Sequence, residues 1–314
     1  MIGLTIWPGA VSVARVNLQG HLVGKPLARL VSGRPSRLVG SAAALLGKAL
    51  GPEVMGVGVS VPGFYDSSSR RVLFGPVAPG REPVSLAPVC EAAGDLPVVI
   101  ENDMHALAAR WLLTHRASAG QDVLLVNVGD GSLGAAMLIG GRPNRGCVSS
   151  ANELGHMRYF TDTGRCYCGQ TGCLERIFSS AYLKRIEGVV GSTEVSEDVS
   201  GGVGGSEVGG GVLMRRSSRY QTGDEVLETL YDYLANGIAN VVNFIRPHRL
   251  VLVSELTRYP GVCDLLSRSI RSRLLSELVD RVRFDLWDQP VARQAETAGW
   301  LALAGLYCEG WYGG

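Results

Sequence analysis

The chain has 314 residues, of which 46% are hydrophobic and 19% are charged, and its formal net charge is +1 at pH 7. This length allows two lobes with their own cores. Dispersed Lys and Arg exclude a basic nucleic-acid surface, and no apolar run is long enough for a membrane span. The start lacks a signal-peptide pattern. We therefore expect a globular, cytoplasmic protein that by itself contacts neither nucleic acid nor membrane.

Residues 1–115 predict an α/β lobe. The turns at 7–10 and 19–21 divide residues 1–25 into three strands. The remaining elements expected here are a helix at 37–50, a strand at 54–61, a hairpin at 64–76, a helix at 84–93, a strand at 97–100 and a helix at 104–114.

Residues 116–314 predict a second α/β lobe, and a last helix at about 292–307 can pack back on the first lobe. Strands and helices alternate along both parts, which suggests two lobes with a cleft between them. The stretch 189–212 is rich in Gly, Ser and Val and is expected to be a flexible insertion without an assigned function. The other elements expected are strands at 123–128, 135–139, 250–253 and 282–286, and helices at 176–187, 224–245 and 261–278.

A cysteine-rich loop covers residues 156–173. Cys166, Cys168 and Cys173 follow His156, and three thiolates with one imidazole suit a closed tetrahedral zinc site. Buried free thiols and disulfides are the alternatives. Free thiols favour apolar surroundings, whereas these cysteines stand among polar residues, so the spacing favours structural zinc. The remaining cysteines have no partners suggested by spacing, which is typical of a reducing compartment.

Two carboxylates, Glu153 and Glu175, bracket this loop. Either could be solvated surface charge. However, a zinc-bound His156 leaves one ring nitrogen for a hydroxyl, and a rigid turn presenting both glutamates would suit a polyhydroxylated ligand.

The pair Asn102-Asp103 follows the predicted strand at 97–100 and precedes a helix. The residues could be no more than a helix N-cap. They also stand at the carboxyl end of a strand, where ligands gather in α/β sheets.

The motifs Glu-x-Gly-His at 153–156 and Cys-x-Cys-Gly-Gln-x-Gly-Cys-Leu-Glu at 166–175 resemble the ROK family of repressors and sugar kinases. The resemblance implies a two-lobed, actin-like or sugar-kinase-like ATPase fold with an inter-lobe cleft. It implies a homodimer, zinc bound by His156 and the three cysteines, and, in the kinases, Asp103 as catalytic base. The residues implied to contact a sugar are Asn102, Asp103, Glu153, His156 and Glu175.

Three sites depart from the pattern that holds ATP and Mg²⁺ in the kinases of this family. The segment 3–10 lacks the Asp and paired glycines of the first phosphate loop and contains Trp7-Pro8. In the second loop Asp130 replaces a Thr between Gly129 and Gly131, so these glycines would be weak phosphate ligands. Residues 254–255 are Ser-Glu where the kinases have Gly-Gly.

The sequence therefore predicts a sugar-sensing domain of a transcriptional regulator that no longer uses ATP well. The alternative is an ATP-dependent, glucokinase-like hexose kinase with Asp103 as the base. Regulators of the family carry a helix-turn-helix domain before the sugar domain, whereas Met1 lies directly on the first predicted strand. DNA would be contacted only through such a domain.

Overall fold

The computed structural model describes residues 1–78, 82–129, 132–146, 152–159, 165–178, 225–254, 262–287, 295–308 and 311. Most of the helix expected at 176–187, the insertion at 189–212, and residues Asp130, Gly131 and Glu255 lie outside this part. The chain divides into two compact units: unit 1 is Met1–Val123, Ala136–Asn152 and Pro290–Gly314, and unit 2 is Leu124–Ala135 and Glu153–Gln289. The chain thus passes between units more than once, whereas the sequence predicted one break after residue 115.

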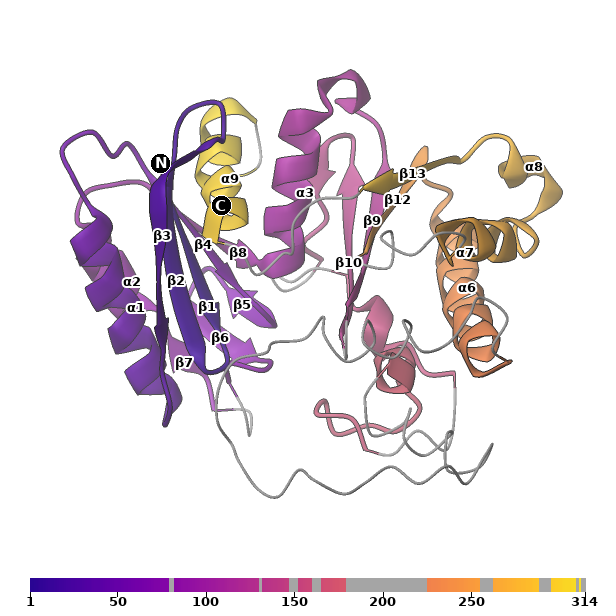
Figure 1. Cartoon of the computed structure of the whole chain (residues 1–314), viewed down its shortest axis with the longest axis horizontal. Coiled ribbons are helices and arrows are strands. Elements are labelled where there is room, and N and C mark those ends of the chain that lie inside the picture. Colours follow the sequence, from indigo (N-terminus) through magenta and orange to yellow (C-terminus); the bar gives the residue numbers. More distant parts are fainter. Residues whose placement is uncertain are drawn as a thin grey trace. The chain divides into compact units, whose positions relative to one another are not determined.

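Unit 1 is built on a five-stranded sheet of order β3-β2-β1-β4-β8 (Figure 1). The strands are β1 (Ile2–Trp7), β2 (Ala10–Val16), β3 (Leu22–Leu30), β4 (Val57–Val61) and β8 (Val98–Asn102). The first three strands are antiparallel, and β1, β4 and β8 are parallel. Pro8 and Gly9 form the two-residue turn between β1 and β2, and the positive φ of 78° at Gly9 explains why a glycine stands there.

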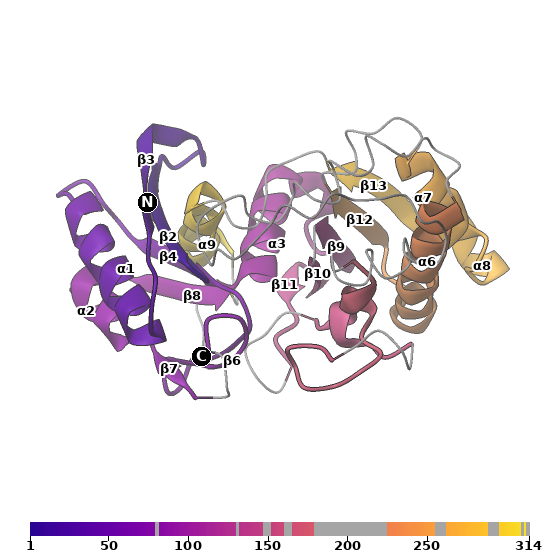
Figure 2. The same ribbon diagram turned by 60° about the horizontal axis from the view of Figure 1, so that its bottom comes forward.

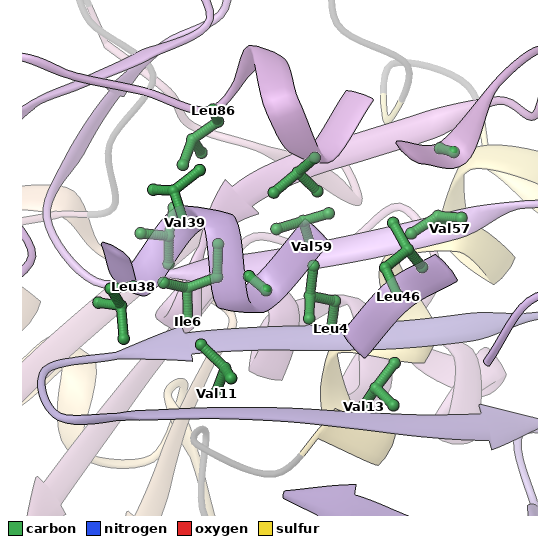
Figure 3. Packing of buried hydrophobic residues seen from close by; sticks show 14 of the residues in the cluster. Leu4, Ile6, Val11, Val13, Leu38, Val39, Leu46, Val57, Val59 and Leu86 are labelled. Atoms are coloured by element: carbon green, nitrogen blue, oxygen red, sulfur yellow. The ribbon is translucent and has the colours of Figure 1, made fainter. Parts of the chain in front are cut away.

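One face of this sheet packs on α1 (Pro35–Ala49) and α2 (Ala87–Ala93). Figure 3 shows the packing, in which alternate residues of the strands meet the apolar side of α1. The labelled side chains are Leu4, Ile6, Val11, Val13, Leu38, Val39, Leu46, Val57, Val59 and Leu86. The helix expected at 84–93 begins later, because Val84–Ser85 form β7, which pairs with β6 (Arg71–Phe74) beside β5 (Phe64–Asp66).

The opposite face of the sheet packs on α9 (Ala295–Tyr307), which also contacts α3 (Asp103–Thr114). The approach is close because glycines face the helix. A Cβ atom on Gly3 would lie 1.8 Å from the carbonyl oxygen of Ala295, and one on Gly58 would lie 2.0 Å from that of Ala298. The absence of side chains at these two positions therefore allows the last helix to lie on the sheet.

A second sheet has the order β11-β10-β9-β12-β13 (Figure 2). Its strands are β9 (Val123–Gly129), β10 (Ser132–Ile139), β11 (Arg142–Pro143), β12 (Arg249–Ser254) and β13 (Arg283–Trp287). The long helix α6 (Glu225–Ile245) lies wholly in unit 2 and buries Leu234, Ile238 and Val242 in a core with residues of β9 and β12.

The helix expected at 261–278 is broken into α7 (Val262–Arg271) and α8 (Ser276–Val279). The side chain of Asn243 stabilises the backbone at the break, because it donates to the carbonyl of Arg273 and accepts from the amide of Leu275. Within the described part of the chain, no helix combines the length and apolarity that a bilayer crossing requires.

Candidate functional site

The four predicted metal ligands lie together in unit 2. The candidate ligand atoms of His156, Cys166, Cys168 and Cys173 all lie within 4.8 Å of one another. The sulfurs of Cys168 and Cys173 are 3.6 Å apart, and Nδ1 of His156 is 3.7 Å from the sulfur of Cys166. Metal–ligand distances of about 2.0–2.3 Å place tetrahedral zinc ligands roughly 3.5–3.8 Å apart. These two separations match those of a closed zinc site, and the three cysteines are free thiols rather than disulfides.

Short backbone hydrogen bonds hold this cluster in place. Cys166 donates its amide to the carbonyl of Gln170, and Gly169 donates back to the carbonyl of Cys166. Gly169 and Gly172 adopt φ values of 89° and 83°, which side-chain-bearing residues rarely reach. These two glycines allow the chain to turn twice within eight residues and to present all three sulfurs to one point.

The pKa values of Cys166, Cys173 and His156 are shifted in the direction that favours their neutral forms. Burial raises the pKa of the Cys166 thiol, and burial together with the neighbouring cysteines raises that of Cys173 to about 12. Burial lowers the pKa of His156, which favours the neutral imidazole that metals bind. These shifts favour the protonated thiols, and a bound cation would supply the charge that stabilises thiolates.

The two predicted glutamates flank the imidazole of His156. One carboxylate oxygen of Glu153 is 3.8 Å from Nε2, and one of Glu175 is 3.8 Å from Nδ1. Glu175 also accepts from the backbone amide of Leu133 at 3.4 Å, which ties it to β10. Two hydrogen-bond acceptors and an imidazole edge are therefore gathered within one short stretch, as a hydroxyl-rich ligand requires.

Tyr167, which was not predicted as a site residue, also contacts this group. The hydroxyl of Tyr167 is 2.8 Å from Nε2 of His156, and the two rings meet edge to face at a centroid distance of 5.0 Å. The position of Tyr167 between two cysteines of the motif was the feature of the sequence that could have indicated this contact. Tyr167 is 54% exposed, so solvent reaches this contact.

The other predicted ligand residues lie in unit 1. Asn102 ends β8 and caps α3, because its side-chain oxygen accepts from the amide of Met104 at 2.8 Å. Its amide nitrogen donates to the carbonyl of Gly63 at 2.9 Å, so both polar atoms of the side chain form hydrogen bonds with the backbone. Asn102 therefore serves as the N-cap of α3, and Asp103 is the first residue of α3.

Glu101, immediately before this pair, was not among the predicted site residues. It is 3% exposed and accepts hydrogen bonds from Nδ1 of His105 at 2.9 Å and from Nε of Arg145 at 2.6 Å. Burial raises the pKa of Glu101, but these two partners outweigh it and hold the pKa below its usual value of 4.5. The i, i+4 spacing of Glu101 and His105 was a signal for one contact, whereas nothing in the sequence indicated Arg145.

The predicted sugar contacts thus fall into two groups, one in each unit. Of the two glycines predicted as weak phosphate ligands, Gly129 is the last residue of β9, and Gly131 lies outside the described residues. Within the segment 3–10, residues 3–7 belong to β1, and Pro8 and Gly9 form the tight turn to β2.

The model of the ROK family matches residues 39–305. The chain is 25% identical to the xylose repressor of Bacillus subtilis over 228 residues, 72% of this chain and 55% of that protein. It is 26% identical to a glucokinase of Halalkalibacterium halodurans over 233 residues, 73% of this chain and 69% of that enzyme. The chain spans about half the length of several curated relatives that it matches.

Among solved structures, a ROK family glucokinase from Streptomyces griseus in complex with glucose and AMPPNP superposes with a TM-score of 0.71 at 24% identity, covering 96% of this chain and 98% of that one. That likeness shows the α/β sugar-kinase-like fold. With a family match over most of its length, the chain belongs to the ROK family.

Proposed function

We propose that this chain binds a sugar and serves as the effector-sensing part of a transcriptional regulator. The observation that carries the proposal is the placement of two carboxylates, Glu153 and Glu175, within 3.8 Å of the two ring nitrogens of His156. Carboxylates accept hydrogen bonds from sugar hydroxyls, and a fixed imidazole adds a donor. The relatives reported above include a xylose repressor and a glucokinase, and both names refer to a sugar.

The cysteine cluster would hold a structural zinc ion in this proposal. Four protein ligands fill a tetrahedral site, so the ion would supply folding stability and ligand orientation. Nδ1 of His156 faces the sulfurs, so the proton of the imidazole would stay on Nε2. His156 would then present an N–H donor beside Glu153.

The regulator is favoured over the kinase by the turn between β1 and β2. Phosphoryl transfer depends on positioning phosphates and Mg²⁺ through backbone N–H groups. Pro8 has no N–H, and the bulky Trp7 precedes it where the kinases carry paired glycines. The altered residues Asp130 and Glu255 of the other two loops also favour the regulator.

A hexose kinase is the second candidate, because Asp103 stands at the carboxyl end of β8 where a base would act. Its carboxylate would accept the proton of a sugar hydroxyl as that oxygen attacks the terminal phosphoryl group of ATP. We further propose, from family resemblance, that the chain forms a homodimer.

The test is calorimetric titration with D-xylose and D-glucose, together with an assay of sugar-dependent ATP hydrolysis. Glu153→Gln removes one charged acceptor and should weaken sugar binding roughly 10- to 100-fold. The matched control is Glu277→Gln on α8, which should bind as the wild type does. An unchanged affinity in Glu153→Gln would move the site elsewhere. ATP turnover that Asp103→Asn abolishes would establish the kinase instead.

A further inference from the structure

The hydroxyl of Tyr167 lies within hydrogen-bond distance of the imidazole of His156. It lies 2.8 Å from Nε2, the ring nitrogen that points away from the cysteine sulfurs. A carboxylate oxygen of Glu153 lies 3.8 Å from the same nitrogen. An imidazole N–H makes one strong, near-linear hydrogen bond, so a second oxygen cannot take the same position.

We propose that Tyr167 sets the affinity and selectivity of the sugar site by competing for Nε2 of His156. This inference rests on the proposed function, and it adds a residue to the site of that function. A sugar hydroxyl that bridges Glu153 and His156 must first displace the phenol. Only sugars that recover this hydrogen bond and add others to Glu153 or Glu175 bind well.

The surroundings of Tyr167 make the displacement possible. The side chain stands at the tip of the turn between Cys166 and Cys168, and it is 54% exposed. Its rotation toward water leaves the backbone of the cluster unchanged, because the bonds from Cys166 to Gln170 and from Gly169 to Cys166 are made by main-chain atoms. The released phenol is hydrated at once, so the opening costs about one solvent-exposed hydrogen bond.

Tyr167 lies inside the predicted metal-binding motif, and this position restricts the geometry of its contact with His156. Cys166 and Cys168 flank the backbone of Tyr167. The rings of Tyr167 and His156 meet edge to face at 73°, which orients the hydroxyl toward the imidazole. The geometry would therefore persist only while the cluster is intact.

The experiment compares Tyr167→Phe with the wild type by calorimetric titration of D-glucose and D-xylose. Tyr167→Phe keeps the ring and deletes the competing oxygen, so the dissociation constant should fall by about 2- to 10-fold, as expected for one net hydrogen bond. The control is Tyr307→Phe, a half-exposed tyrosine of α9 in unit 1, which should leave the constant unchanged. An equal or weaker affinity in Tyr167→Phe would overturn the proposal, since the phenol would then be neutral or a sugar ligand.

Long-range ¹H–¹⁵N spectra of the imidazole test the contact without any sugar. The Nε2-bound proton of His156 should shift upfield and exchange faster in Tyr167→Phe than in the wild type. An unchanged signal would refute the contact with Tyr167. If neither protein binds either sugar while the signal changes, the proposed function fails and the competition inferred from it is rejected as well.

Discussion

Replacing Glu101 with glutamine tests the buried network beside Asn102 and Asp103. The substitution keeps the shape of the side chain but removes the charge that His105 and Arg145 hold at 2.9 and 2.6 Å. Removing one partner of a fully buried ion pair costs about 3–5 kcal/mol. The Arg145 side chain is 22% exposed and can recover some water, so we expect a loss of about 2–3 kcal/mol in the free energy of unfolding.

Urea unfolding followed by tryptophan fluorescence measures this loss. Four of the five tryptophans belong to unit 1, so the signal reports mainly on the unit that contains Glu101. The matched control is Glu91→Gln on α2, an exposed carboxylate in the same unit, which should change stability by less than about 0.5 kcal/mol.

The pH dependence has a defined sign. The pKa of Glu101 is lowered in the folded protein, so its contribution is present above the usual value of 4.5 and is lost as the pH falls through the folded pKa. The stability gap between wild type and Glu101→Gln should therefore be full at neutral pH and shrink on acidification below about 4.5. A variant as stable as Glu91→Gln at neutral pH, or a gap that persists in acid, would refute this reasoning.

Three further outcomes are expected. Purified wild type should contain about one zinc ion per chain by elemental analysis, and Cys168→Ser should lose it; stoichiometric zinc in the variant would contradict the ligand set. Gly58→Ala should destabilise unit 1 by about 3 kcal/mol or more, because the added methyl would lie 2.0 Å from the carbonyl of Ala298, whereas Gly40→Ala on α1 meets open space and should be neutral or slightly stabilising. Asn102→Ala should cost about 1–2 kcal/mol in urea unfolding through loss of the α3 cap; no loss would mean that water replaces the cap.

Features encoded by neighbours in sequence could be predicted from the sequence. The apolar positions three and four residues apart predicted α6 within one residue at its start, and Pro-Gly indicated the turn between β1 and β2. The cysteine cluster was predictable because its four ligands lie within 18 residues, and a short chain with glycines can bring them to one point. The family followed from the same motif.

Tertiary structure alone decided the contacts between distant segments. Glu101 and Arg145 are 44 residues apart and meet only when β8 and the segment after β11 are folded together. Gly58 and α9 approach closely only because the last helix returns to the first sheet. Even Tyr167, between two predicted ligands, required the folded turn to show that its hydroxyl meets His156. Sequence patterns report which face of an element is apolar, whereas the partner of a buried charge or hydroxyl depends on how the elements pack in space.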